Sequence, residues 1–430
     1  MKKLTIISYS FPPSNAPAAQ RPYTIAKYLA QGGFKVSVLS CSNQDSSLGL
    51  QRQVLKPSEF KLFRVSGFSL KWLRKRKNKK MANKRSSNLD SGSNVVSTFS
   101  KWVFPDKAIT WFPFALIWCL FNPGKFYKGN LLTTSPLITN HLLGLVLKFL
   151  FNLNWIVDIR DFHYVNNYEN KKTSLITKMH KWLETKIIKN ADVVSFISKS
   201  MLHEYASYYE KYAYKFNAIY NGYDPDDFPL IQNTDNTISI ESLPIKIFYA
   251  GSFYRGVRSP VPLICALDRL RELGIINAMD IEIEIAGNFE NELLANLEAF
   301  PISEKINFLG NLPRKEVLLK MQKAHLLWLI VGDDKNHSAG IPLKAFEYIG
   351  AKRPILCFAP KGTETPAMIE SLQAGWILSN SPSDFDSNVE ILKRVFIEKK
   401  YALSNSTNDS IKLNAFNRKF QAFEFGNLIS

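Results

Sequence analysis

Short apolar runs alternate with helical segments along this chain, and the alternation occurs twice. The apolar runs are typical of buried strands, and the segments between them carry the three-to-four-residue apolar spacing of helices. Alternation of this kind favours parallel sheets covered by helices on both faces. In the first series, the expected strands are 4–8, 35–39, 61–65, 130–134, 155–159, 192–197 and 216–220, and the expected helices are 23–29, 137–151, 173–189 and 199–208.

The second series follows a polar, irregular stretch at 226–244, which we interpret as an interdomain linker. Its expected strands are 245–250, 281–286, 306–309, 326–331, 355–358 and 375–378, and its expected helices are 262–273, 290–300, 314–322, 343–350, 365–372 and a last one at 412–428. At 430 residues the chain also exceeds what one core supports. The sequence predicts an α/β protein of two tandem Rossmann-like, doubly wound domains that face a cleft.

The predicted domains are residues 1–225, with an insertion at about 42–100, and residues 245–405, followed by a crossover helix within 406–430. A hydrophobic content of 46% indicates a globular chain. Its cysteines are widely spaced, without the density of a disulfide scaffold or the spacing of a zinc site, which favours a cytoplasmic protein. The apolar run after Met1 is too short for a signal peptide and is interpreted as the first strand.

The net charge is +18, and nine Lys and Arg residues fall between Lys71 and Arg85 with no acidic residue among them. One interpretation is a solvated, disordered block. The other is a contact with an anionic membrane surface, which we predict, because basic residues bind acidic headgroups and Trp72 lies beside them. Nucleic acid is not an expected partner, since no recognised motif accompanies the charge.

Residues 109–121 form the most apolar stretch of the chain, which is too short to cross a bilayer. A buried or half-buried helix is the preferred interpretation. Its aromatic residues, among them Trp111 and Trp118, would also suit the interface between lipid and water.

A helix predicted at 343–350 opens after a Gly340-Ile341-Pro342 turn, and its first turns carry Lys344 and Glu347 among apolar residues. The first N–H groups of a helix lack partners within it and bind anions. Lys344 adds a point charge suited to phosphate, and Glu347 can accept hydrogen bonds from sugar hydroxyls. These features together fit a nucleotide-sugar diphosphate.

Four further junctions after predicted strands are rich in polar residues. Each alone is explained by a turn or a local ion pair, whereas all of them in this order form a stronger pattern. They are Phe11–Pro13 with Gln20–Pro22, then Asp158, Arg160 and Asp161, then Asn221, Gly222 and Asp224, and finally the stretch from Gly251 to Arg258.

Taken together, these motifs resemble the family-4 glycosyltransferases of the GT-B fold, in particular the bacterial branch that builds surface polysaccharides. The resemblance covers nearly the whole chain outside 42–100. It implies a retaining hexosyltransferase that moves a sugar from a nucleotide-sugar donor to a lipid-linked or glycan acceptor. The acceptor would belong to lipopolysaccharide, capsule or exopolysaccharide biosynthesis, and the enzyme would be peripheral on the inner face of the plasma membrane.

The resemblance also implies roles for individual residues. Glu347 would hold ribose hydroxyls, and Lys344 with Arg255 or Arg258 would neutralise the diphosphate. The donor site as a whole would consist of Gly251, Ser252, Arg255, Arg258, Gly287, Gly340, Ile341, Pro342, Lys344 and Glu347. Asp158, Arg160 and Asp161 are the expected catalytic residues, and Arg21 and Asn221 lie on the expected acceptor side. No cofactor and no metal ion are expected.

Two departures from the family pattern stand out. Ala339 occupies the place of the first family glutamate, which leaves the contacts to the donor sugar open, and Ala18-Ala19 replaces a common Gly-Gly. Two other functions therefore stay open. A nucleotide-sugar epimerase on the same scaffold would consume donor without an acceptor, and a non-catalytic glycan- or membrane-associated scaffold protein would not consume it at all.

Overall fold

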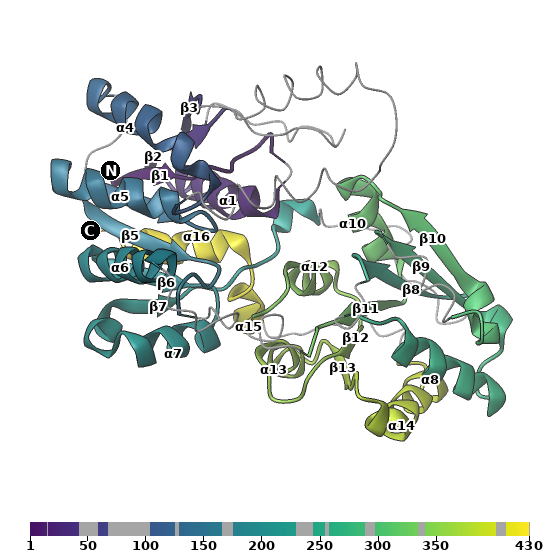
Figure 1. Ribbon diagram of the computed structural model, residues 1–430. Helices are drawn as coiled ribbons and strands as arrows, with labels where there is room; N and C mark the ends of the chain where they lie inside the picture. The colour runs from purple at the N-terminus through teal and green to yellow at the C-terminus, as the bar shows by residue number, and fades with distance from the viewer. Residues whose placement is uncertain are drawn as a thin grey trace, which may run out of the picture. The chain divides into compact units, whose positions relative to one another are not determined.

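The computed structural model describes residues 1–14, 16–42, 59–67, 104–124, 129–165, 175–228, 244–253, 258–288, 297–333, 340–400 and 410–429 (Figure 1). The chain forms two compact units. The first consists of Met1–Ile219 together with Ala422–Ser430, and the second of Tyr220–Gln421. Several features of the sequence lie outside the described residues. They are the basic run at 71–85, most of the insertion at 42–100, most of the predicted helix at 290–300, Arg255 and Ala339.

The first unit contains a seven-stranded parallel sheet in the order β3-β2-β1-β4-β5-β6-β7. The direction of winding reverses between β1 and β4, as in doubly wound folds. Its strands are β1 (Lys3–Ile7), β2 (Lys35–Cys41), β3 (Lys61–Val65), β4 (Asn130–Thr134), β5 (Asn154–Ile159), β6 (Val193–Phe196) and β7 (Phe216–Ala218). Its helices of eight or more residues are α1 (Pro17–Gln31), α4 (Phe112–Phe121), α5 (Ile138–Phe151), α6 (Leu175–Asn190) and α7 (Lys199–Tyr208), and the end of α16 (Arg418–Asn427) joins them.

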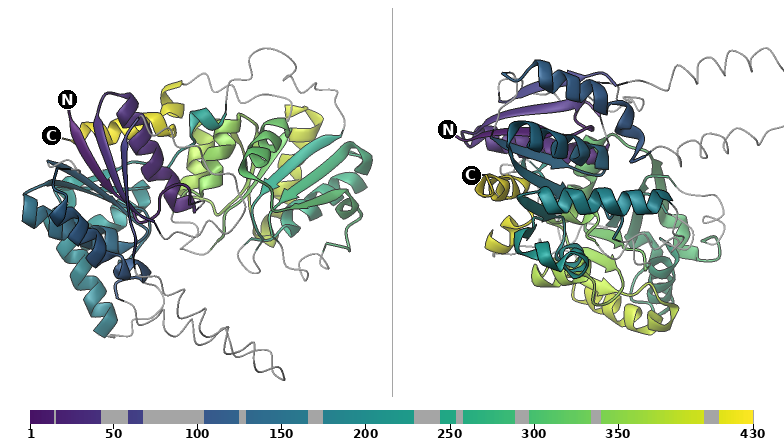
Figure 2. Two further views of the ribbon diagram at one scale, coloured as in Figure 1. Left: turned by 90° about the horizontal axis from the view of Figure 1, so that it is seen from above. Right: turned by 60° about the vertical axis from the view of Figure 1, so that its left-hand side comes forward.

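Strand alternation gives this sheet two separate cores. Ile7, Leu131 and Val157 point toward α4, α5 and α6, which contribute such residues as Ala115 and Leu147. The residues between them in the strands pack on the other face against α1 and the end of α16. Figure 2 shows the two groups of helices on opposite faces of the sheet.

The first helix begins earlier than predicted. It starts at Pro17 rather than near Tyr23, and it includes Pro22, so Gln20 and Arg21 lie on a helix and not in a loop. Pro17 stands at the start of the helix, where its missing N–H costs nothing. The proline-rich stretch was interpreted as a turn because Pro22 normally interrupts a helix.

The second unit contains a six-stranded parallel sheet in the order β10-β9-β8-β11-β12-β13, with its reversal between β8 and β11. The strands are β8 (Ile245–Ala250), β9 (Ile281–Ala286), β10 (Ile306–Gly310), β11 (Leu326–Ile330), β12 (Ile355–Phe358) and β13 (Gly375–Leu378). The helices are α8 (Val261–Glu272), α10 (Arg314–Lys323), α12 (Leu343–Ala351), α13 (Glu364–Ser371), α14 (Phe385–Ile397), α15 (Ser410–Asn414) and the start of α16.

Again the sheet is covered on both faces. Helices α8 and α14 pack on the face that carries Ile247, Tyr249 and Trp328. Helices α10, α12 and α13 pack on the face that carries Phe248 and Leu329. The α/β prediction with two doubly wound, Rossmann-like halves is confirmed by this topology.

In the second unit, one helix was missed and one helical prediction was wrong. Helix α14 was not predicted, although apolar residues recur along it at helical spacing. The single helix predicted at 412–428 is instead α15 and α16, with a break between them. At the break, Tyr223 donates its N–H to the Phe416 carbonyl, and its own carbonyl accepts from the Arg418 N–H. The strand-like bridge between Tyr223 and Asn417 therefore interrupts the helix.

Among the described residues, no helix has both the length and the apolar composition that crossing a bilayer requires.

Candidate functional site

The helix α12 begins where the sequence predicts. Its N-cap is Pro342, which has an extended backbone conformation, and its buried face consists of such residues as Ala345, Phe346 and Ile349. It ends at Lys352, whose φ of 55° is left-handed and closes the last turn. Apolar packing along one side thus holds the helix against the sheet and leaves its first turn at the carboxyl-end edge of the strands.

The start of α12 carries unpaired backbone donors. Within the described part of the chain, the N–H groups of Ile341, Leu343 and Lys344 make no hydrogen bond. Such groups, together with the positive end of the helix dipole, bind anions such as phosphate. Gly340, which precedes them, accepts a hydrogen bond at its carbonyl from Thr365 Oγ1 at 3.5 Å.

Lys344 lies at this N-terminus with its ammonium group over an aromatic ring. Its Nζ is 4.2 Å from the centroid of the Tyr249 ring and donates to the Tyr249 hydroxyl at 3.0 Å. Burial and the nearby Arg258 charge, opposed in part by Glu347, together lower the pKa of Lys344 to about 7. The approach of an anion stabilises the charged form of this ammonium group and raises its pKa toward the ordinary range.

Two glycines at the ends of adjacent strands bring backbone close to Lys344. Gly251 follows β8 with a φ of 144°, and Gly287 follows β9 with a φ of 149°. A Cβ atom on Gly287 would lie 2.0 Å from the Gly251 carbonyl oxygen, and one on Gly251 would lie 3.0 Å from Lys344 Nζ. Both positions require glycine, because any side chain would meet backbone or the Lys344 ammonium and would strain the chain.

The remaining predicted donor residues of this unit lie in the same region. Ser252 follows Gly251, and its carbonyl accepts from the Tyr249 hydroxyl at 3.3 Å. Arg258 is close enough to Lys344 to lower its pKa, so the two cations share one neighbourhood. Arg255 was predicted beside Arg258 but lies outside the described residues.

Glu347 forms an ion pair that was not predicted. Its Oε1 accepts from Arg314 Nη1 at 2.5 Å, and Arg314 Nη2 donates to Asp227 Oδ2 at 2.6 Å. Burial of Arg314 favours its neutral form, but Glu347 and Asp227 outweigh burial and raise the pKa of Arg314. Removal of the Glu347 carboxylate should lower stability, because it leaves Arg314 with one partner fewer.

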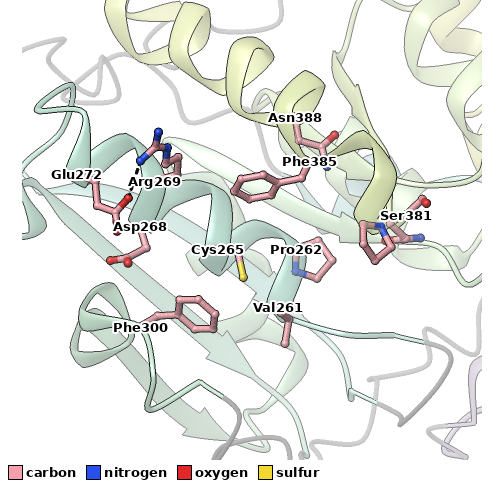
Figure 3. Close-up of a pocket in the computed structure, with 12 residues that line it drawn as sticks. Val261, Pro262, Cys265, Asp268, Arg269, Glu272, Phe300, Ser381, Phe385 and Asn388 are labelled. Atoms are coloured by element: carbon pink, nitrogen blue, oxygen red, sulfur yellow. Dashed lines mark hydrogen bonds and ion pairs between the residues drawn. The ribbon is translucent and has the colours of Figure 1, made fainter.

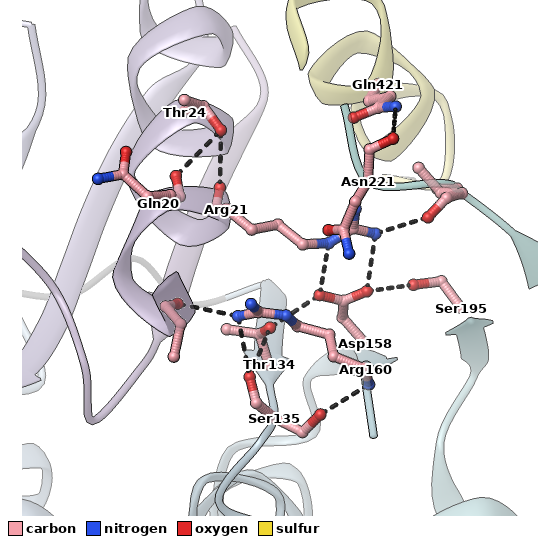
Figure 4. A network of polar contacts seen from close by, with 12 residues as sticks. Gln20, Arg21, Thr24, Thr134, Ser135, Asp158, Arg160, Ser195, Asn221 and Gln421 are labelled. Carbon is pink, nitrogen blue, oxygen red and sulfur yellow. Dashed lines mark hydrogen bonds and ion pairs between the residues drawn. The ribbon is translucent and has the colours of Figure 1, made fainter. Parts of the chain in front are cut away.

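In the first unit, Asp158 is fully buried, and its two oxygens bind other protein groups. Arg21 donates from both Nε and Nη2 at 3.0 Å, while Thr134 donates at 2.7 Å and Ser195 at 2.8 Å (Figure 4). Burial raises the pKa of Asp158, but Arg21, Arg160 and Thr134 outweigh it and leave the pKa lowered.

Asp158 was predicted to be catalytic and Arg21 to contact the acceptor, and the structure places the two side chains in one buried ion pair. Arg21 is 4% exposed, and besides Asp158 it binds the Ile219 carbonyl at 2.8 Å. Its guanidinium also lies 5.2 Å from the centroid of the Phe425 ring. The pair holds β5, α1 and the end of α16 together, and neither side chain is open to a substrate.

Arg160 is likewise mostly buried, at 8% exposure, and its Nη1 donates to the Ala18 carbonyl at 2.8 Å. Pro22, four residues after Ala18, has no N–H to offer this carbonyl. Arg160 therefore supplies the hydrogen bond that the proline removes from α1. A second bond reaches the Ser135 carbonyl at 3.2 Å and fixes the guanidinium at the end of β5.

Asp161, next along the chain, is the most exposed of the three predicted catalytic residues. Partial desolvation raises the pKa of its carboxyl, Arg160 opposes the rise, and Asp158 adds to it.

Asn221 is 7% exposed and belongs to the second unit, where its carbonyl accepts from Gln421 Nε2 at 2.9 Å. The predicted role of Asn221 on the acceptor side stays a prediction.

No group of three or more His, Cys, Asp or Glu side chains in the described ranges is arranged to hold a metal ion. His141 is fully buried, its Nδ1 lies 2.8 Å from Thr133 Oγ1, and burial with the nearby His163 lowers the pKa of His141 to about 3. This histidine is a neutral part of the core.

A pocket of about 550 Å³ lies between α8 and α14, on the other face of the second sheet from α12 (Figure 3). Apolar side chains such as Phe300 and Phe385 line it, and its charged residues pair with neighbours, as Arg269 does with Glu272 at 2.8 Å. None of the residues predicted to bind the donor lines this pocket.

The architecture of two doubly wound parallel sheets is the GT-B fold. Among solved structures that share it, sucrose-phosphate synthase from Thermosynechococcus elongatus is 13% identical, with a TM-score of 0.64 over 100% of this chain and 98% of the other. HepE from Anabaena, solved with UDP and glucose, is 11% identical with a TM-score of 0.61 over 99% of both chains. WaaG, described as a glycosyltransferase involved in lipopolysaccharide biosynthesis, is 13% identical with a TM-score of 0.58 over 99% of both chains.

At this level of identity, the likeness is one of fold. No protein-family model matches the chain, and no curated protein matches it. The function must therefore be inferred from the residues of this chain.

Sequence reasoning missed two residues of the α12 site, Tyr249 and Arg314. Tyr249 lies in a strand that reads as plain core, and nothing in the sequence marks it as a partner of Lys344. Arg314 had a signal that was overlooked. It is the first residue of α10, where a positive charge opposes the helix dipole unless acidic partners offset it.

Proposed function

We propose that this protein is a glycosyltransferase that binds the nucleotide part of a nucleotide-sugar at the start of α12. One observation carries the proposal. Unpaired N–H groups, the Lys344 ammonium with its lowered pKa, and the glycines Gly251 and Gly287 come together at the N-terminus of one helix. Glu347 lies one turn further along the same helix. A nucleoside diphosphate needs this order of groups, with cations for phosphate and a carboxylate for ribose.

The diphosphate of the donor would lie against Gly340, Ile341 and Pro342, with Lys344 and Arg258 as its cations. Gly251, Ser252 and Gly287 would form the adjacent wall, and Arg255 remains part of this proposal. In sugar transfer, the bond between the sugar and the diphosphate breaks, and negative charge grows on the leaving group. Fixed cations and a helix N-terminus stabilise this charge without a metal ion, so we propose a metal-independent reaction.

The transferred group would be a hexose, and its acceptor would be a lipid-linked or glycan hydroxyl in surface polysaccharide biosynthesis. Retention of configuration belongs to the proposal through the family resemblance. Of the two carboxyls predicted to be catalytic, Asp161 is the exposed one, and we propose that it faces the acceptor, with Arg160 fixed beside it. The fold shared with HepE and WaaG supports this class of reaction.

A transfer assay tests the proposal. Purified protein is incubated with each of a panel of nucleotide-sugars, with and without a bacterial membrane extract, and released nucleoside diphosphate is measured. We expect release only when donor and extract are both present. Donor that is converted without extract would indicate the epimerase, and donor that neither binds nor reacts would contradict both enzymes.

We also propose that the protein works at the cytoplasmic face of the membrane as a peripheral protein. Helices α4, α5 and α6 cover one face of the first sheet (Figure 1). They expose many large apolar side chains. These are Phe114, Ile117, Leu120, Phe121, Phe149, Leu150, Leu175, Met179 and Trp182. No residue of α4 is charged, and an apolar helix open to water favours contact with lipid.

The charges on α6 match an anionic leaflet. Lys178, Lys181, Lys186 and Lys189 are exposed on this helix, and its acidic residue, Glu184, is buried. Exposed lysines beside Trp and Met are typical of surfaces that lie on a membrane.

Co-sedimentation with vesicles tests this surface. We expect binding to phosphatidylglycerol vesicles that is weaker with phosphatidylcholine alone and is reduced by Ile117→Asp. Ile397→Asp is the matched control, because Ile397 is 60% exposed and Ile117 is 51% exposed, but Ile397 lies in the second unit. Equal loss in both variants, or binding unchanged by Ile117→Asp, would contradict the assignment. Replacing the Lys and Arg residues at 71–85 by neutral ones, in the same vesicle assay, tests the basic run separately.

A further inference from the structure

Arg314 joins three separate elements of the second unit. It is the first residue of α10, Glu347 lies in α12, and Asp227 ends the short 3-10 helix η3 (Pro225–Asp227). The two ion pairs, at 2.5 and 2.6 Å, use different nitrogens of one guanidinium. Because the guanidinium is planar, each carboxylate meets it in a defined direction, and the two contacts are made by separate N–H groups.

Glu347 is held by one oxygen. Its Oε1 accepts from Arg314, while Oε2 makes no hydrogen bond to any residue that the structure describes. The carboxylate is 17% exposed and the Arg314 side chain 37% exposed, so the pair is partly open to solvent. A Glu side chain on its own samples several rotamers, and the contact with Arg314 selects one of them.

Arg418 contributes a second guanidinium to the same neighbourhood. It is 7% exposed, and it lies close enough to Arg314 for the two positive charges to repel each other. Burial lowers the pKa of Arg418, while Asp224, Glu347 and Asp227 oppose the fall. The guanidinium groups of Arg314 and Arg418 are therefore balanced by the carboxylates of Asp224, Asp227 and Glu347. Arg314 itself has a carboxylate partner on each of two nitrogens.

We propose that Arg314 is a positioning residue for nucleotide recognition, which rests on the proposed function above. By holding Oε1, it turns Oε2 toward the vicinal hydroxyls of the ribose, which then donate to a carboxylate that is already oriented. A site built to accept from a hydroxyl rejects ligands that lack it, because the acceptor is then left unpaired. The consequence is that Arg314, without touching the ligand, sets the preference for ribonucleotides over 2′-deoxyribonucleotides.

The competing interpretation is that Arg314 only fastens η3 to the body of the second unit. In that case its loss lowers stability and affects all nucleotides alike. The ratio of affinities for a ribonucleotide and its 2′-deoxy counterpart separates the two interpretations, because a general loss of stability leaves the ratio unchanged.

The test is calorimetric titration of UDP, ADP and GDP, each with its 2′-deoxy counterpart, into the full chain. For the wild-type protein we expect a preference of about 10-fold or more for the ribonucleotide that binds best. Arg314→Gln should reduce this preference to below about 3-fold, and Arg314→Lys should restore part of it. Asp227→Asn is the control, since it weakens the tie to η3 and leaves the contact with Glu347 in place.

Each result decides between the interpretations. If Arg314→Gln keeps the wild-type preference, or if Asp227→Asn abolishes it equally, Arg314 is a structural tie and the inference fails while the proposed function stands. A wild-type protein that binds UDP but does not distinguish it from 2′-deoxy-UDP also overturns the inference. If the wild-type protein binds none of the six nucleotides, the proposed function itself fails. Melting temperatures of all variants show whether folding accounts for a loss.

Discussion

Binding of a nucleoside diphosphate should take up a proton at Lys344, which makes affinity depend on pH. Burial, with the charge of Arg258, places the pKa of this ammonium at about 7 in the free protein. A bound diphosphate beside it favours the charged form and raises the pKa toward the ordinary value of about 10.4. The complex therefore holds a proton that part of the free protein lacks.

The size of the effect follows from that pKa. The protonated fraction of free Lys344 falls from about one half at pH 7 to about one hundredth at pH 9, so affinity should fall about 50-fold across this interval. The phosphate groups of the ligand have a last pKa near 6 and are fully ionised over most of the range. The ligand itself therefore contributes little to the slope.

Isothermal titration of UDP in buffers of different ionisation enthalpy measures both quantities. We expect uptake of about half a proton at pH 7 and nearly one at pH 8, together with the fall in affinity. Lys344→Arg, which stays charged, should remove the pH dependence, and Lys344→Met should remove both the slope and most of the affinity. A wild-type affinity that is constant from pH 7 to 9, with no proton uptake, would refute this role of Lys344.

Three further predictions concern stability. First, the unfolding free energy of wild-type protein should rise relative to that of Lys344→Met as pH increases from 7 toward 10, because the unfolded state binds a proton that the folded state has lost; parallel curves in denaturant titrations would contradict this. Second, Gly287→Ala should destabilise the second unit by about 2 kcal/mol or more, since its Cβ would lie 2.0 Å from the Gly251 carbonyl oxygen, and urea unfolding measures the loss. Third, Asp158→Ala should cost about 3–5 kcal/mol, because it leaves Arg21 buried without its carboxylate, and an unchanged melting temperature would count against the buried pair.

Much of the fold could be predicted because parallel strands are buried on both faces. The strand at Ile355–Phe358 is a continuous apolar run, the strand at Ile245–Ala250 is apolar apart from Lys246, and the observed bounds of both equal the predicted ones. Helix boundaries were less certain where proline intervenes. The start of α1 was missed because Pro22 reads as a break, whereas in the fold Arg160 supplies the hydrogen bond that Pro22 removes.

The site was predictable only where its residues are neighbours in sequence. Lys344 and Glu347 share one helix with the Gly340 turn, so their pattern is visible in a single segment. The partner of Asp158 lies 137 residues away and that of Glu347 lies 33 residues away. Sequence alone could not show that Asp158 belongs to a buried ion pair, because an exposed catalytic Asp and a buried structural one have the same local motif.

We propose that α12 and the strand ends beside it hold the nucleotide part of the donor. The decisive measurement is a crystal structure of the protein with the nucleoside diphosphate that binds it most tightly. We expect diphosphate oxygens within hydrogen-bonding distance of the Ile341 and Leu343 N–H groups and of Lys344 Nζ, with ribose hydroxyls on Glu347. A nucleotide found instead in the pocket between α8 and α14, with α12 untouched, would contradict it.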